Sequence, residues 1–118
     1  MSTQEVANRL YELCQQGQFK EAQQELYAPE ITSTESTPTG ERITVKGMEG
    51  LAAKAKQFNE MVEAMHGGYT KEPTVFGKYI FMEMGMDVTM KGMGRMNMVE
   101  LARYEVNNGK IVAEEFYY

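Results

Sequence analysis

The stretch MEMGMDVTMKGMGRMNMVE, from Met82 to Glu100, contains seven of the eleven methionines of this 118-residue chain. Six of them keep one parity on each side of a glycine-rich break, Gly92-Met93-Gly94. Because strand side chains alternate between two faces, this spacing predicts a long β-hairpin with one face covered by thioethers. Glu100 falls on that same face. A deformable apolar wall that carries one carboxylate indicates a small-molecule pocket.

The register of this hairpin depends on which residues form its loop. If Gly92–Gly94 form a three-residue loop, Met86 lies opposite Glu100, and Val88 lies opposite Met98. One face is then apolar and the other mostly polar, as a half-solvated antiparallel sheet requires. A slip by one residue would gather three carboxylates on one face, so we reject it.

The remaining chain alternates helical and strand patterns. Apolar spacing predicts a helix from about Ser2 to Gly17, a second helix from Phe19 to Pro29, and a third over 47–65 that ends at His66-Gly67-Gly68. The predicted strands are 31–36, a weak 42–45, an extended edge 69–74, and then 78–91, 95–107 and 110–118. Helices followed by a run of strands predict an α+β domain over 1–118, with three helices on one face of an antiparallel sheet.

Composition excludes several classes of function. The net charge is −5 and the lysines and arginines are scattered, which argues against nucleic acid and against anionic membrane surfaces. No apolar run is long enough to span a membrane, and the polar start of the chain does not resemble a signal peptide. A single cysteine, Cys14, allows no internal disulfide, so we expect a cytoplasmic protein with a buried, inert thiol.

The later half of the chain resembles a known family. The resemblance lies in Asp87–Gly92, in Met98–Leu101, and in Tyr104–Val112 with its Gly-Lys-Ile-Val turn, followed by the Glu-Glu-Phe of 114–116. Together with the order of helices and strands, these segments are similar to the SnoaL-like family of the nuclear transport factor 2-like, cystatin-like α+β superfamily. The resemblance implies a curved antiparallel sheet that forms a cone-shaped pocket with the three helices.

The resemblance also implies a class of chemistry. The family includes polyketide cyclases and ketosteroid-isomerase-like enzymes, which use an acidic general base with a histidine or tyrosine nearby. The acid of the cyclases stands on the penultimate strand, at about Ala102 here, and Glu100 is one pleat away on the same face. Glu114 stands where the family often has a histidine on the final strand.

Glu100 is the residue that packing does not explain, because a carboxylate among thioethers needs a raised pKa or a partner. As a general base it would remove a proton beside a carbonyl group. The candidate site residues are Glu100, His66 and Glu114 for catalysis, and Met84, Met86, Met98, Tyr104 and Phe58 for contact with a ligand. Each has a structural alternative: a satisfied buried acid, a helix-capping histidine, or core packing.

Methionine repeats also invite a copper interpretation, since soft thioethers bind Cu(I). Same-face neighbours on a strand stand about 6.8 Å apart, however, which is too far for a row of sulfurs to share one ion. No motif indicates a metal, a nucleotide or a flavin, so we expect no cofactor.

Three functions remain open. The first is a cofactor-free enzyme that acts on a small apolar carbonyl compound, and the second is a ligand-binding or carrier module without chemistry. The third is a structural dimerisation domain with a filled core. In each case we expect a homodimer through the outer sheet face, where Tyr79, Phe81, Val99 and Leu101 fall, partly by analogy with the fold.

Overall fold

The methionine-rich stretch forms a long hairpin in the computed structural model, which describes residues 1–118. Strand β5 (Tyr79–Met90) pairs with β6 (Gly94–Asn107), and Met84 lies opposite Glu100. The predicted register was therefore wrong by two residues, because Gly94 adopts a φ of 82° and pairs with Met90, which leaves Lys91–Met93 as the turn. An even shift preserves side-chain parity, so the predicted faces are unchanged.

The first two helices form where the sequence predicts them, although the second ends at Leu26, three residues before the predicted end at Pro29. Helix α1 (Thr3–Gln15) begins with a capping box in which Ser2 and Glu5 satisfy each other's backbone N–H groups. Helix α2 (Phe19–Leu26) follows after Gly17, whose φ of 72° turns the chain back. The apolar stripes of both helices face the sheet, and Arg9 of α1 forms an ion pair with Glu25 at 2.6 Å.

The third helix is shorter than predicted. Helix α3 (Gly47–Met61) ends four residues before the expected boundary, and the chain continues directly into β3 (Val62–Thr70). Val62 and Met65 extend the apolar helical stripe in sequence, but in the structure they pair with Met90 and Val88 of β5. Long-range pairing along the edge of the sheet thus overrides a local helical pattern.

The sheet is mixed and open. Its remaining strands are β1 (Tyr27–Ser36), β2 (Arg42–Lys46), β4 (Thr74–Phe76) and β7 (Lys110–Tyr117). The strand order is β2-β1-β7-β6-β5-β3, and β4 also pairs with β5. All pairs are antiparallel except β1 with β7, a parallel pairing that the sequence did not predict. A parallel pair needs a long crossover, and here the whole chain from β2 to β6 provides it.

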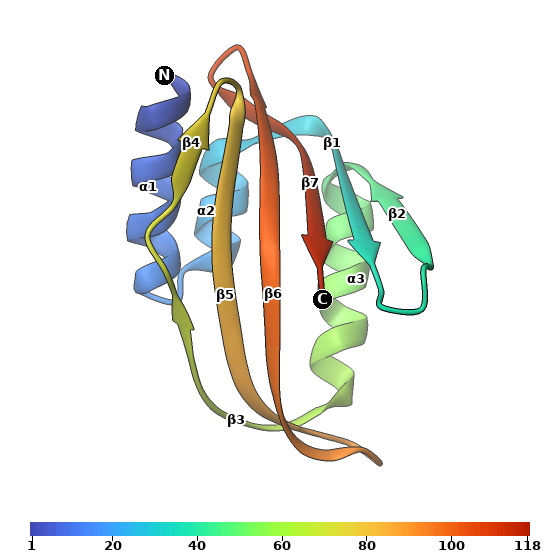
Figure 1. Ribbon diagram of the computed structural model, residues 1–118. Coiled ribbons are helices and arrows are strands. Elements are labelled where there is room, and N and C mark those ends of the chain that lie inside the picture. The colour runs from blue at the N-terminus through green and yellow to red at the C-terminus, as the bar shows by residue number, and fades with distance from the viewer.

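The three helices cover one face of the curved sheet (Figure 1). The core lies between α1, α2 and the inner face of the strands, and its fully buried side chains include Leu10, Ile31, Ile80, Met82 and Tyr104. Helix α3 contributes only Leu51 to the buried residues. Most of its inner side therefore faces unfilled space. None of the helices has the length and apolarity that crossing a membrane would require.

Candidate functional site

A large cavity lies between α3 and the inner face of the sheet. Its volume is about 1240 Å³, and residues of all three helices and of β1, β3, β5, β6 and β7 line it. The cavity exists because α3 packs through its first turns only. Ala55 and Phe58, from the apolar stripe of α3, line the cavity instead of entering the core. A mostly apolar concave surface of this kind is the usual form of a small-molecule site.

The sequence-predicted site residues gather here with one exception. Those that line the cavity are Phe58, Met84, Met86, Met98, Glu100, Tyr104 and Glu114. The register places Met84 opposite Glu100, and Met86 opposite Met98, so the three methionines and Glu100 are neighbours on two paired strands. Met82 and Met90, by contrast, are buried and not part of the lining. The methionine row therefore serves both as core and as cavity wall.

His66 is the exception. Because α3 ends at Met61, His66 falls on β3 and not at a helix end, and its Nε2 lies 2.8 Å from Oγ1 of Thr89. It lies close enough to Asp87 to contribute to that carboxyl's lowered pKa, although Arg95 has the larger effect. His66 is not among the residues that line the cavity, so the structure gives it no contact with Glu100.

Glu100 lies half-buried on the cavity wall and takes part in no ion pair. Burial is the main reason that its pKa rises from 4.5 to about 7. The nearby carboxyls of Glu35 and Glu114 raise this pKa further, whereas the Tyr118 hydroxyl and the Lys54 ammonium lower it. The cavity therefore holds a carboxyl that changes its charge near neutral pH.

Glu114 is the second carboxyl of the cavity and is only 4 % exposed. The parity of the last strand, which the sequence left open, turns it inward opposite Tyr104. It accepts hydrogen bonds from the Tyr27 hydroxyl and, at 2.7 Å, from the Ser33 hydroxyl. Burial raises the pKa of Glu114, and the two hydroxyl donors partly oppose this effect. Burial also raises the pKa of the Cys14 thiol to about 11, in line with an inert cysteine.

Lys54, which the sequence analysis did not single out, lies near these carboxyls. Nζ of Lys54, on α3, lies 2.5 Å from a carboxylate oxygen of Glu35 and donates to the Ser33 hydroxyl at 2.9 Å. It also lies 5.0 Å from the ring centroid of Phe116. The Tyr118 hydroxyl donates to Glu35 from the end of the chain. A signal for Lys54 was present, since it follows Leu51 by three residues and so borders the apolar stripe of the helix.

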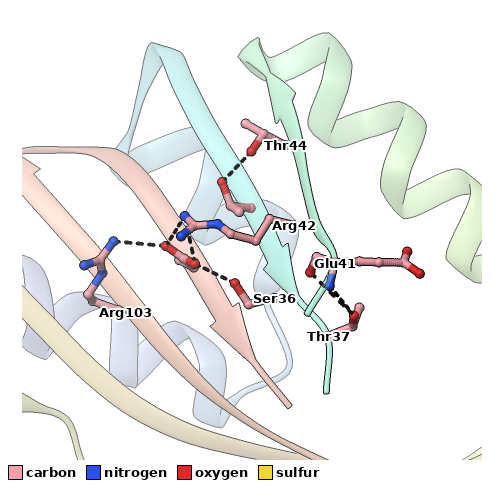
Figure 2. A network of polar contacts seen from close by, with 8 residues as sticks. Ser36, Thr37, Glu41, Arg42, Thr44 and Arg103 are labelled. Atoms are coloured by element: carbon pink, nitrogen blue, oxygen red, sulfur yellow. Dashed lines mark hydrogen bonds and ion pairs between the residues drawn. The ribbon is translucent and has the colours of Figure 1, made fainter. Parts of the chain in front are cut away.

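The opposite face of the sheet holds another buried carboxyl, that of Glu115, whose charge is neutralised within the chain. Glu115, also 4 % exposed, accepts from Arg42 at 3.1 Å, from Arg103 at 3.2 Å and from Ser36 at 2.6 Å. Figure 2 shows Arg42 and Arg103 converging from two sides, with Ser36 between the strands. Two guanidinium groups thus neutralise Glu115. Neither Glu100 nor Glu114 has such a partner.

No group of three or more histidine, cysteine, aspartate or glutamate side chains is arranged to hold a metal ion. The side chains that line the cavity include three carboxyls, three phenols and five thioethers. Such a set can bind an apolar molecule, exchange a proton and donate or accept hydrogen bonds.

Comparison with solved structures shows the fold and its relatives. A protein of Mesorhizobium loti, named a candidate SnoaL-like polyketide cyclase and carbohydrate phosphatase, is 36 % identical, with a TM-score of 0.91 and coverage of 100 % of both chains. A candidate SnoaL-like polyketide cyclase of Jannaschia sp. CCS1 is 14 % identical at a TM-score of 0.73, with coverage of 97 % of this chain and 83 % of the other.

A Catenulispora acidiphila protein with a ketosteroid isomerase-like fold, solved in complex with trimethylamine, is 18 % identical at a TM-score of 0.72. The alignment covers 99 % of this chain and 87 % of that one. Among curated proteins, none matches the sequence at a significant level. The family model of the SnoaL-like domain matches residues 1–118 in full. This protein therefore belongs to the SnoaL-like family, with the α+β architecture of the nuclear transport factor 2-like superfamily.

Proposed function

We propose that the protein binds a small apolar carbonyl compound in the cavity and that Glu100 removes a proton from the carbon beside the carbonyl group. One observation carries this proposal: Glu100 is a carboxyl without an ion-pair partner on a thioether wall, and burial raises its pKa to about 7. A general base works best when its pKa lies near the operating pH. Family membership supports a pocket-bearing protein of this kind.

The neighbouring groups have defined parts in this proposal. The ionised Glu100 carboxylate accepts the proton, and the substrate becomes an enolate. Tyr104 lies on the same strand, one inward-facing residue beyond Ala102, and its hydroxyl is a candidate donor to a ligand oxygen. Glu114, with the Tyr27 and Ser33 hydroxyls bound to it, is a candidate assisting acid. Met84, Met86, Met98 and Phe58 would contact the apolar body of the ligand.

The test is hydrogen–deuterium exchange at the α-carbon of an apolar enolisable ketone such as 2-tetralone, followed by NMR in deuterated buffer. The wild-type protein should accelerate the exchange, and the rate should rise with pH to a plateau above about pH 7, as Glu100 ionises. Glu100→Gln should abolish the acceleration, whereas Glu49→Gln, at an exposed position of α3 outside the cavity, should not change it. Equal rates for Glu100→Gln and wild type would refute a base role for Glu100.

A second function keeps the same cavity without chemistry. If the ketone binds but its exchange is not accelerated, the ligand-binding or carrier function replaces the catalytic one. The apolar wall of Met84, Met86 and Met98 supports this alternative equally well, because polarizable thioethers adapt to many shapes.

The outer face of the sheet supports a homodimer. Val99 is 52 % exposed and Leu101 is 42 % exposed, and Tyr117 lies opposite Leu101 on β7. The charged groups around them are largely neutralised within the chain, by the ion pairs of Arg103 with Glu115 and of Arg95 with Asp87. An exposed apolar strip between satisfied ion pairs suits a self-complementary contact between two copies.

A further inference from the structure

The charged groups around Glu100 do not balance. Three carboxyls, those of Glu35, Glu100 and Glu114, influence one another there, as their effects on the pKa of Glu100 show. The one ammonium group in their midst is Lys54. Its ion pair with Glu35, at 2.5 Å, and its hydrogen bond to Ser33, at 2.9 Å, already engage it. Glu100 and Glu114 thus face the cavity without a cation of their own.

A buried carboxyl elsewhere in the chain does have cationic partners. On the other face, Glu115 is as buried as Glu114 and is held by two arginines. An ionised carboxyl in an apolar wall costs free energy unless a positive charge lies beside it. Glu115 has two such cationic partners, whereas Glu100 and Glu114 form no ion pair.

The remaining wall suits a positive charge. Tyr104 and Phe116 line the cavity as an edge-to-face pair, with ring centroids 6.4 Å apart at 86°, and Phe58 lines it from α3. Aromatic faces attract ammonium groups, and the attraction grows when water is excluded. The Lys54 ammonium already lies 5.0 Å from the ring centroid of Phe116. At the rim, Lys20, Lys56 and Glu60 are exposed, so the charges at the opening are mixed and screened by water.

From this arrangement we propose that the cavity selects an organic cation, a molecule with an apolar body and a protonated amine that lies between Glu100 and Glu114. The apolar body contacts the thioethers of Met84, Met86 and Met98, and the ammonium group supplies the charge that the two carboxyls lack. The inference rests on the proposed function only in that the cavity is a ligand site. If Glu100 also acts as a base, the substrates are carbonyl compounds that carry an amine.

The experiment compares three probes with one apolar body: adamantylamine, adamantanol and adamantane carboxylate. Isothermal titration calorimetry at about pH 8 should give a dissociation constant for the amine about tenfold or more below that of the alcohol, with the carboxylate weakest. Glu100→Gln should reduce the preference for the amine over the alcohol, and Glu49→Gln should leave it unchanged.

The wild-type protein provides a second readout that needs no variant. The ratio of amine to alcohol affinity should fall as the pH is lowered through about 7, because Glu100 then takes up a proton. The groups that face Glu100 across the elements are Glu35 of β1, Lys54 of α3, Glu114 of β7 and Tyr118, and amine binding at neutral pH should release protons from the carboxyls among them.

The inference would be overturned by an alcohol or carboxylate that binds as tightly as the amine, or by a preference for the amine that Glu100→Gln leaves intact. Failure here is distinct from failure of the proposed function. Glu100-dependent exchange of the ketone without a preference for the amine refutes the cation and retains the base. A preference for the amine without exchange of the ketone refutes the base role of Glu100 and retains the cation proposal. If none of the probes binds, the cation proposal is refuted whatever the exchange result.

Discussion

Replacement of Glu100 by glutamine should stabilise the protein at alkaline pH. The folded state holds the pKa of Glu100 at about 7, against 4.5 for the unperturbed group, so in this range the folded protein binds more protons than the unfolded chain. The contribution of Glu100 to stability is therefore most favourable below about pH 4.5 and decreases as the pH rises to about 7. Each pKa unit corresponds to about 1.4 kcal/mol, which gives a full penalty of about 3 kcal/mol for the ionised form.

The open side of the cavity lets water screen the carboxylate, so we take about 2 kcal/mol as the expected effect. Glutamine has the shape of the protonated acid and carries no charge. Glu100→Gln should therefore match the wild type at about pH 4 and exceed its free energy of unfolding by about 2 kcal/mol at about pH 8.

Urea denaturation followed by circular dichroism, from about pH 4 to about pH 8.5, measures this difference directly. Glu49→Gln removes a carboxyl from an exposed position of the same domain and should track the wild type throughout. A stability difference between Glu100→Gln and wild type that stays constant with pH would refute the reasoning. So would a variant that is less stable than wild type at pH 8.

Three further predictions concern other parts of the fold. Tyr27→Phe removes a hydroxyl that donates to buried Glu114, so it should cost about 1 to 3 kcal/mol of stability at about pH 8 and less at about pH 4, measured by urea denaturation. An equal cost at both pH values would contradict the ionised-acceptor explanation. Gly85→Ala should destabilise the protein, because the new Cβ would lie 2.1 Å from a ring carbon of Tyr69; in a Tyr69→Ala background the same change should be neutral in thermal unfolding. Additive effects of these two substitutions would argue against the clash. Leu101→Glu should convert the proposed homodimer to monomers in size-exclusion chromatography with light scattering, without lowering the helix and strand content. A dimer that persists in this variant would place the interface elsewhere.

The hairpin illustrates what the sequence could predict. Parity alone decides which face a strand residue joins, so Met84, Met86, Met98 and Glu100 were assigned to one face correctly even though the loop was misplaced. The misplacement arose because two glycines flank the turn, and only the structure shows that Gly94 belongs to the strand.

The errors arise where distant parts of the chain meet. Val62 and Met65 continue a helical stripe, yet β5 offers them strand partners, and His66 moves with them onto β3 and away from the cavity. The parallel pairing of β1 with β7 brings Ser33 beside Glu114 and Glu35 beside Phe116. Nothing local in the sequence indicates either contact. The contacts of Lys54 with Ser33 and Glu35 were missed for this reason.

The direct test of the central claim, that Glu100 is a cavity carboxyl with a near-neutral pKa, is its titration by NMR. Selective ¹³C labelling of glutamate, with Glu100→Gln to assign the Cδ resonance, gives the midpoint in the free protein. We predict a midpoint of about 7 for Glu100. A midpoint near 4.5 would show that the carboxyl is ionised and well solvated at neutral pH, and would contradict both its base role and the structural argument behind it.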